Sequence, residues 1–220
     1  MSRTGAKLIS FEGGEGAGKT TQLALLAAAF DDAGLSHIRT REPGGCASAE
    51  AIRDLLVNGD ADRWLPQTEA LLMMAARFEH VQRTIQPALM ADSWVLCDRF
   101  FDSTRVYQGG AKGLGDDWLK PLYRLLFGQF APALTFFLDI DPQEGLARTQ
   151  ARGGQEARFE SLPLSFHQQV REGFLALCEQ EPHRFVRLDA AQDTLALHHQ
   201  LIEALNQRYA LQLRAREVLA

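Results

Sequence analysis

The feature that most constrains this chain is the glycine-rich segment Gly13–Thr20, which reads G-x-x-x-x-G-K-T. It follows a short apolar run and precedes a stripe with helical spacing, formed by Leu23, Leu26, Ala27 and Phe30. This strand–loop–helix order is the setting in which such a loop binds phosphate groups. Its glycines let consecutive backbone N–H groups turn toward an anion, and the helix N-terminus adds the positive end of its dipole. The segment therefore predicts a binding site for the phosphates of a nucleotide.

Short runs with strand character alternate with longer helical stretches along the rest of the chain. The five runs expected to form strands are Lys7–Phe11, Ser36–Thr40, Trp94–Asp98, Leu134–Asp139 and Phe185–Asp189. Strands separated by helices form parallel βαβ units, whose helices cover both faces of the sheet. The pattern predicts the α/β class, with a parallel sheet between two layers of helices.

Local signals mark several of the connecting segments. Asp141, Pro142 and Glu144 form a helix start, with an acidic N-cap, a proline at the first helical position and a capping-box glutamate. Further apolar stripes predict two later helices, with the residues Phe166, Val170, Phe174 and Leu177, and Leu195, Leu201, Ile202, Leu205 and Tyr209. Two glycine-bearing segments, Tyr107–Gly115 and Gln150–Glu160, are expected to be loops. The second has few apolar residues to bury, so we expect it to be mobile.

Length and composition favour one globular domain. The 220 residues contain no internal repeat and no linker, so residues 1–220 are expected to form a single domain.

The net charge of −5 disfavours a protein that coats nucleic acid or an anionic membrane. The apolar stretch Leu125–Leu138 is too short to span a bilayer, and Met1–Lys7 does not lead into a secretory signal. Three scattered cysteines indicate reduced thiols, and we expect a cytoplasmic protein without nucleic-acid or membrane partners. The histidines lack a metal-binding spacing and are expected to be structural or on the surface.

The P-loop predicts specific roles for nearby residues. Lys19 is expected to reach the β and γ phosphates, and the Thr20 hydroxyl to bind Mg²⁺. A carboxylate at the end of a neighbouring strand commonly completes such a metal site, and both Asp98 and Asp139 occupy such a position. Asp98 is favoured because Arg99 follows it directly, which places a guanidinium where parallel sheets bind ligands.

Five motifs in order along the first half of the chain carry a resemblance to a known family. They are Phe11-Glu12-Gly13-Gly14-Glu15-Gly16-Ala17-Gly18-Lys19-Thr20-Thr21, Thr40-Arg41-Glu42-Pro43-Gly44-Gly45, Ala75-Ala76-Arg77, Asp98-Arg99, and Ser103-Thr104 with Tyr107-Gln108-Gly109-Gly110. An arginine-bearing segment near Arg152 and the run Leu188-Asp189-Ala190 extend the match. The P-loop is generic, whereas its combination with Arg-Glu-Pro-Gly-Gly and Tyr-Gln-Gly-Gly is specific. The chain resembles the bacterial thymidylate kinases.

This resemblance implies a P-loop NTPase fold with a five-stranded parallel sheet wrapped by helices in three layers. It also implies a nucleoside-monophosphate-kinase-like domain with a mobile lid at about residues 150–160. The implied activity is the MgATP-dependent phosphorylation of dTMP to dTDP, for dTTP synthesis, by a homodimer. Two other hypotheses remain open, namely a P-loop kinase for another nucleotide or small acceptor, and a nucleotide-dependent switch ATPase.

Site residues follow from the same resemblance. Catalytic roles are implied for Lys19, Arg99, Arg152, Arg158 and Glu15. The implied ATP-binding residues are Gly13, Gly14, Glu15, Gly16, Ala17, Gly18, Lys19, Thr20 and Thr21, and the implied metal-binding residues are Thr20 and Asp98. The implied dTMP-binding residues are Glu42, Pro43, Arg53, Met73, Arg77, Arg99, Thr104, Tyr107 and Gln108.

The resemblance also implies how these residues bind dTMP. Arg99 and Arg53 would bind its phosphate, and Arg77, Thr104 and Gln108 would contact the base. Tyr107 would exclude a ribose 2′-OH, and Glu15 would meet the sugar 3′-OH. Glu42 would line the phosphate and metal region, and the Glu42-Pro43 peptide bond would be cis.

Two positions depart from the family pattern or select a subtype within it. Met73 stands where relatives commonly carry a phenylalanine that stacks on thymine, so a thioether contact would replace the aromatic ring. Met73 and Arg77 are four residues apart and share one helix face. Gly16 stands where the eukaryotic type has a P-loop arginine, which implies the bacterial type with an arginine in the lid. Arg152 and Arg158 are the candidates.

Overall fold

The five expected strands form one parallel sheet. The structure is a computed structural model, and it describes residues 7–151 and 157–216. The strands are β1 (Leu8–Glu12), β2 (His37–Arg41), β3 (Trp94–Asp98), β4 (Leu134–Asp139) and β5 (Phe185–Asp189), in the order β2-β3-β1-β4-β5. All four pairings are parallel. The predicted bounds of β3, β4 and β5 are confirmed, and β1 and β2 each lie one residue later than predicted.

The central strands position the candidate site. β1 and β4 are buried along their whole length, which agrees with their mainly apolar sequences and their central place in a parallel sheet. β1 lies between β3 and β4, and Phe11 of β1 is paired with Asp98 of β3. The carboxyl ends of β1 and β3 therefore lie side by side. Parallel α/β sheets bind their ligands at this edge.

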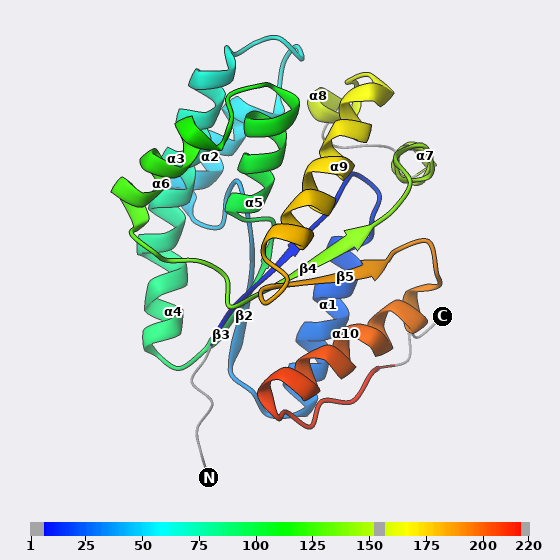
Figure 1. Cartoon of the computed structure of the whole chain (residues 1–220). Helices are drawn as coiled ribbons and strands as arrows, with labels where there is room; N and C mark the ends of the chain where they lie inside the picture. The colour runs from blue at the N-terminus through cyan, green and yellow to red at the C-terminus, as the bar shows by residue number, and fades with distance from the viewer. Residues whose placement is uncertain (1–6, 152–156, 217–220) are drawn as a thin grey trace.

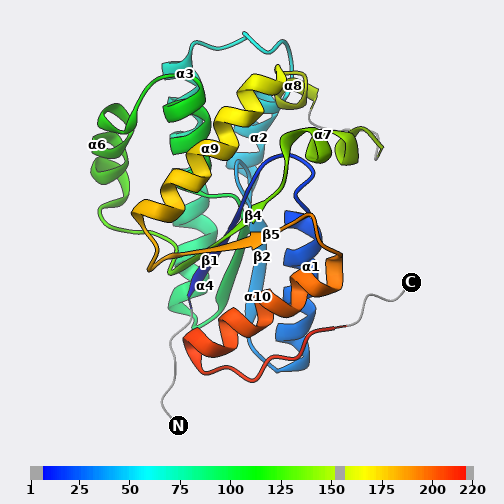
Figure 2. The same ribbon diagram turned by 45° about the vertical axis from the view of Figure 1, so that its right-hand side comes forward.

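Helices cover both faces of the sheet, and the three-layer prediction is confirmed (Figure 1). The helices α1 (Lys19–Asp32) and α10 (Thr194–Tyr209) pack on one face, where Leu26, Phe30 and Leu201 are buried. The view in Figure 2 shows α10 lying against α1. The helical layer on the opposite face is larger. Its elements are α2 (Ala47–Val57), α3 (Pro66–His80), η1 (Val81–Ile85), α4 (Gln86–Met90), α5 (Phe101–Thr104), η2 (Arg105–Ala111), α6 (Asp116–Phe127) and α9 (Leu164–Gln180).

The elements α3, η1 and α4 follow one another without a break, and the change of helical type in η1 has a local cause. Pro87 occupies the first turn of α4 and has no backbone N–H to donate to the preceding turn. A wider π-type turn, η1, precedes it and re-spaces the backbone hydrogen bonds. The helical segment that begins at Pro66 thus continues to Met90 despite the proline.

The helix start predicted at Asp141 is confirmed in part. The helix α7 spans Pro142–Ala151, and the Asp141 carboxylate accepts a hydrogen bond from the backbone N–H of Gln143 at 2.9 Å. Glu144 instead accepts from Arg148 one turn later, at 2.6 Å. The acidic cap is therefore present, whereas the glutamate forms an i,i+4 ion pair.

The loop predicted for Tyr107–Gly115 is wrong in its first half. Residues up to Ala111 belong to η2, and the chain leaves the helix only after them. The glycines of this segment were interpreted as turn residues, but Gly109 has a different role. A Cβ on Gly109 would lie 2.9 Å from the Leu119 side chain of α6. Gly109 thus lets two helices approach closely.

The lid segment Gln150–Glu160 is also not entirely a loop. Residues 150 and 151 end α7, and α8 spans Ala157–Glu160. Arg158 and Phe159 are buried, although the segment has few apolar residues. Residues 152–156, including Arg152, lie outside the described residues. Within residues 7–151 and 157–216, no helix combines the length and apolar character needed to cross a bilayer.

Candidate active site

The P-loop connects β1 to α1 with three residues in the left-handed half of backbone space. Gly13, Gly16 and Gly18 have φ values of 144°, 70° and 87°, which side-chain-bearing residues rarely adopt. A Cβ on Gly13 would also lie 2.5 Å from the carbonyl oxygen of Leu138 in β4. The loop therefore needs these glycines both for its curvature and for its contact with the sheet.

A second glycine contact fixes the outer side of the loop. A Cβ on Gly16 would lie 2.0 Å from the carbonyl oxygen of Gly145 in α7, and a Cβ on Gly145 would lie 2.3 Å from that of Glu15. The P-loop and the first half of α7 thus meet backbone to backbone. Gly145 was not expected from the sequence, because it lies about 130 positions from the loop in an ordinary helix.

Lys19 and Thr20 follow the loop and open α1. The Lys19 amine donates to the carbonyl oxygens of Gly13 and Gly14, at 3.2 and 2.8 Å, and therefore lies over the loop. Burial, together with the nearby guanidinium of Arg99, lowers the pKa of this amine. The Thr20 hydroxyl donates to Asp98 Oδ2 at 2.8 Å.

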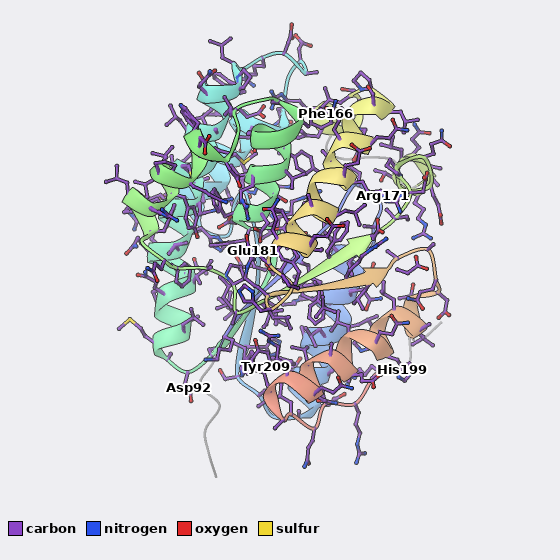
Figure 3. All side chains as sticks on the ribbon, in the orientation of Figure 1. Asp92, Phe166, Arg171, Glu181, His199 and Tyr209 are labelled. Atoms are coloured by element: carbon purple, nitrogen blue, oxygen red, sulfur yellow. The ribbon has the colours of Figure 1, made fainter. Side chains whose placement is uncertain are left out.

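The hydrogen bond from Thr20 distinguishes Asp98 from Asp139, the other acid that could complete the metal site. Asp98 lies beside Thr20 at the end of β3. Asp139, at the end of β4, accepts from Arg171 of α9 at 2.7 Å and from Arg187 of β5 at 2.6 Å. Figure 3 labels Arg171 on α9. Hydrogen bonds from these two arginines outweigh the cost of burial and lower the pKa of Asp139. Asp139 is thus paired with arginines of α9 and β5, and of these two acids it is Asp98 that lies beside Thr20.

Arg99 lies between the P-loop and η2. Its guanidinium donates to the Gly13 carbonyl at 3.0 Å, to Ser103 Oγ at 3.1 Å and to Glu15 Oε1 at 2.9 Å. The same Glu15 oxygen accepts from the Tyr107 hydroxyl at 3.0 Å. Burial raises the pKa of Glu15, but Arg99 and Lys19 outweigh it, so the net shift is downward. Arg99 has a φ of 66°, a strained value for this residue type, and such strain concentrates at functional sites.

A buried acid supports the turn that carries Arg99. Glu12, at the end of β1, accepts from the backbone N–H of Phe100 at 2.8 Å and from Ser103 Oγ at 2.6 Å. Burial, followed by the nearby Asp102, raises the pKa of Glu12 to about 8. Ser103 Oγ also accepts a hydrogen bond from Arg99, so Ser103 links Glu12 to the Arg99 guanidinium.

On the acceptor side, Arg77 of α3 is held by a chain of buried polar groups. Its Nε donates to Glu42 at 2.6 Å, and its Nη2 donates to Thr104 Oγ1 at 3.1 Å. Glu42 also contacts Nδ1 of His80 at 3.0 Å, and His80 Nε2 contacts Thr40 Oγ1 at 2.6 Å. Glu42, predicted to line the phosphate and metal region, thus also orients the arginine predicted to contact the base.

Other predicted acceptor residues surround Arg77. Met73 and Arg77 both line the cavity, which confirms that they share one helix face. Arg53 donates to the Pro43 carbonyl at 2.6 Å and lines the cavity as well. The Glu42-Pro43 peptide bond is cis, as the resemblance implies.

Arg158, one of the two candidate lid arginines, lies away from the P-loop. Its guanidinium donates to the carbonyl oxygens of Leu56, Asp60 and Ala61 at 2.8 to 3.1 Å, and to Glu69 Oε2 at 2.6 Å. It is only 2% exposed. In this conformation Arg158 therefore anchors α8 to the segment between α2 and α3, and its role at the transferred phosphate stays a prediction.

One cavity of about 880 Å³ connects the two groups of residues. Lys19, Thr20 and Asp98 line one part of it, and Arg77 and Gln108 line another. Its volume lies in the upper part of the range for small-molecule sites, which is about 300–1,000 Å³. The arrangement therefore offers a phosphate-binding loop and an acceptor pocket within one continuous space.

Comparisons with known proteins agree with this geometry. The family model described as thymidylate kinase matches residues 11–201. The chain belongs to the thymidylate kinase family. A thymidylate kinase of Magnetococcus marinus is 52% identical over 186 residues, covering 84% of this chain and 89% of its own. A thymidylate kinase of Caulobacter vibrioides is 49% identical, covering 92% and 97%.

A solved structure supports the same assignment. The crystal structure of thymidylate kinase from Ehrlichia chaffeensis matches with a TM-score of 0.74 and 32% identity, covering 91% of this chain and 99% of that one. The P-loop NTPase fold expected from the sequence is thereby confirmed for this member of the thymidylate kinase family.

Sequence reasoning missed several supporting residues. His80, expected to be an ordinary structural histidine, is fully buried and contacts Glu42. Glu12, Glu69 and Gly145 were not singled out either. Among the described residues, no group of three or more histidines, cysteines or acids has the arrangement of a metal centre. Only spatial proximity identifies these residues, because each acts through a partner distant in the sequence.

Proposed function

We propose that this member of the thymidylate kinase family transfers the γ-phosphoryl group of ATP to dTMP, forming dTDP. One observation carries the proposal: a single cavity joins the P-loop residues to Arg77, Thr104 and Gln108. The acceptor phosphate needs no strong base, because its second pKa is about 6 and it is therefore ionised at neutral pH. Catalysis then consists of positioning and of neutralising the charge of the transferred group.

The donor half binds the ATP phosphates. Backbone N–H groups of Gly13–Thr21 and the Lys19 amine would surround the β and γ phosphates. Lys19 now lies on the carbonyl oxygens of Gly13 and Gly14, so phosphate binding exchanges these neutral partners for anionic ones. Arg99, which faces the same loop, would bind the dTMP phosphate together with Arg53.

Mg²⁺ fits the donor half. Thr20 Oγ1 and Asp98 Oδ2 lie 2.8 Å apart beside the P-loop, and hard oxygen atoms of this kind suit the ion. When bound, Mg²⁺ neutralises phosphate charge during transfer. Thr20 and Asp98 would hold it directly or through its water molecules.

The acceptor half selects base and sugar. Arg77 would donate to the base, with the Met73 thioether against its face, and both residues line the cavity. Tyr107 would leave no room for a ribose 2′-OH. Its hydroxyl is held by Glu15, which we expect to meet the sugar 3′-OH.

A coupled assay of ADP formation tests the proposal. It compares dTMP, dUMP, dGMP, dCMP and no added acceptor at saturating MgATP. We expect strong activity with dTMP. Equal turnover with another monophosphate would favour a different acceptor, and acceptor-independent ATP hydrolysis would favour a switch ATPase.

Exposed apolar side chains on the outer helices support the implied homodimer. Leu71 and Phe78 of α3 are 50% and 39% exposed, and Leu125 of the adjacent α6 is 81% exposed. Exposed apolar groups at neighbouring positions commonly mark an interface. Sedimentation should therefore give the mass of two chains at micromolar concentration, and Leu125→Glu should shift it toward one. A monomeric wild type would contradict the proposal. We also expect a cytoplasmic location, in keeping with nucleotide substrates and three unpaired cysteines.

A further inference from the structure

The carboxylate of Glu69, on α3, holds side chains from two other elements near the acceptor half of the cavity. Oε1 accepts from Gln108 Nε2 at 2.8 Å and from Lys112 Nζ at 2.7 Å. Oε2 accepts from Lys112 Nζ at 2.9 Å and from Arg158 Nη2 at 2.6 Å. Glu69 has no exposed surface, and each of its oxygens has two donors.

The two cations fix this carboxylate in place. Arg158 is itself held by the backbone carbonyls of Leu56, Asp60 and Ala61, so it cannot follow a movement of Glu69 without breaking those bonds. Lys112 contacts both oxygens of the carboxylate. Glu69 is thus oriented by groups that do not belong to the cavity wall, whereas its third partner, Gln108, lines the cavity.

The chemistry of Glu69 determines which end of the Gln108 amide it can bind. A carboxylate only accepts hydrogen bonds, so it selects the amide nitrogen and disfavours the amide oxygen. The two ends of an amide have nearly the same size, so packing alone does not select one orientation. With Nε2 on Glu69, the oxygen of Gln108 is the end left for a ligand in the cavity.

We propose that Glu69 is a specificity-determining positioning residue, which turns the amide oxygen of Gln108 toward the base of the nucleotide acceptor. The proposal rests on the proposed dTMP kinase activity. A hydrogen-bond acceptor at this place matches the N3–H of thymine. It repels the N3 lone pair of cytosine, which is itself an acceptor. Uracil carries the same N3–H as thymine, so Glu69 should discriminate against dCMP and not against dUMP.

The test measures kcat/KM of the wild type and of Glu69→Gln with dTMP, dUMP and dCMP. The variant keeps the side-chain volume but can accept or donate, so the Gln108 amide is free to rotate. We expect the dTMP-to-dCMP ratio to fall about tenfold, which is the worth of one well-placed hydrogen bond. The dTMP-to-dUMP ratio should stay within about twofold. A merely structural role would lower all three values alike, and unchanged ratios in the folded variant would overturn the proposal.

A double-mutant cycle shows whether Glu69 acts through Gln108. Gln108→Met removes the amide at similar volume, and Glu69→Gln should then cause no further fall in the dTMP-to-dCMP ratio. A persisting effect in that background would overturn the proposal. Lys112→Met is the matched control, since it removes an ion pair of Glu69 but keeps the contact with Gln108, and the ratio should stay unchanged.

One more variant keeps the test valid if Glu69→Gln fails to fold. Glu69→Asp retains the charge that Lys112 and Arg158 require and withdraws the carboxylate from Gln108 by one methylene group. The dTMP-to-dCMP ratio should fall about threefold or more, and an unchanged ratio would overturn the proposal. A wild type that fails to phosphorylate dTMP would instead refute the proposed function, so the two failures are distinguishable.

Discussion

The contact between Gly145 and the P-loop predicts a large loss of activity from the addition of one methyl group. In Gly145→Ala the new Cβ would lie 2.3 Å from the carbonyl oxygen of Glu15. Ordinary contact begins at 3.4 Å. The P-loop or the first turns of α7 must therefore move by about 1.1 Å, the difference between these distances. The atoms that must yield belong to the backbone, so no side-chain rotation relieves the contact.

Stability and activity should respond differently to this change. Alanine in a helix is favoured over glycine by about 1 kcal/mol. Overpacking typically costs about 1–3 kcal/mol, so the net loss of unfolding free energy should be at most about 2 kcal/mol. A misplacement of about 1 Å at a phosphate-binding loop can cost about 100-fold in rate. The variant should therefore fold and yet lose most of its phosphoryl transfer.

Steady-state kinetics with MgATP and dTMP, together with thermal unfolding, measure both effects. Gly110→Ala is the matched control, because Gly110 lies in a helix and the atom nearest to its new Cβ is 3.9 Å away. We expect the control to retain activity within about twofold. A folded Gly145→Ala protein with the same activity as the control would refute the reasoning.

Four further predictions concern residues of the site. Lys19→Ala should lower phosphoryl transfer by about a thousandfold or more with an unchanged circular dichroism spectrum; a folded and active variant would remove the P-loop assignment. Glu12 should make the unfolding free energy fall as pH rises from about 4.5 to 8, because the folded protein keeps its proton up to about 8 whereas the unfolded chain releases it near 4.5. Chemical denaturation between pH 5 and 9 should show this slope in the wild type and not in Glu12→Gln. Tyr107→Ala should raise the relative activity toward a ribonucleotide acceptor by about tenfold, whereas Tyr107→Phe, which keeps the ring, should not; equal selectivity in both variants would contradict the proposed role. Arg152→Ala and Arg158→Ala should lower turnover more than dTMP binding, and undiminished turnover in both would exclude a catalytic arginine in the lid.

The strands illustrate why much of the fold could be predicted from the sequence. The runs Trp94–Asp98 and Leu134–Asp139 have the predicted bounds, because buried strands of a parallel sheet are rich in apolar residues. The bounds of Phe185–Asp189 are also as predicted, although this edge strand is only partly buried. The prediction of a loop at Tyr107–Gly115 is wrong because glycine has two uses. It permits positive φ in turns, but at Gly109 it makes room for Leu119 of another helix.

Some residues of the candidate site could be predicted from the sequence, and others required the structure. The P-loop residues were predicted because their function depends on a contiguous segment of backbone. The choice between Asp98 and Asp139 required the structure, because both end apolar strands and only Asp98 lies beside Thr20. Arg158 was predicted to act at the transferred phosphate, and the structure shows it bound to Glu69 and to backbone carbonyls.

The sequence by itself determined that this chain is an α/β protein with a phosphate-binding loop. It also carried the motifs of the thymidylate kinase family. These properties are encoded locally, in the spacing of apolar residues and in short segments whose chemistry does not depend on distant partners. Only the tertiary structure decided which groups support the site. Gly145 against the P-loop, His80 against Glu42, and Glu69 against Gln108 are contacts between elements far apart in the chain. Their significance lies in distance and burial, which a linear pattern does not contain.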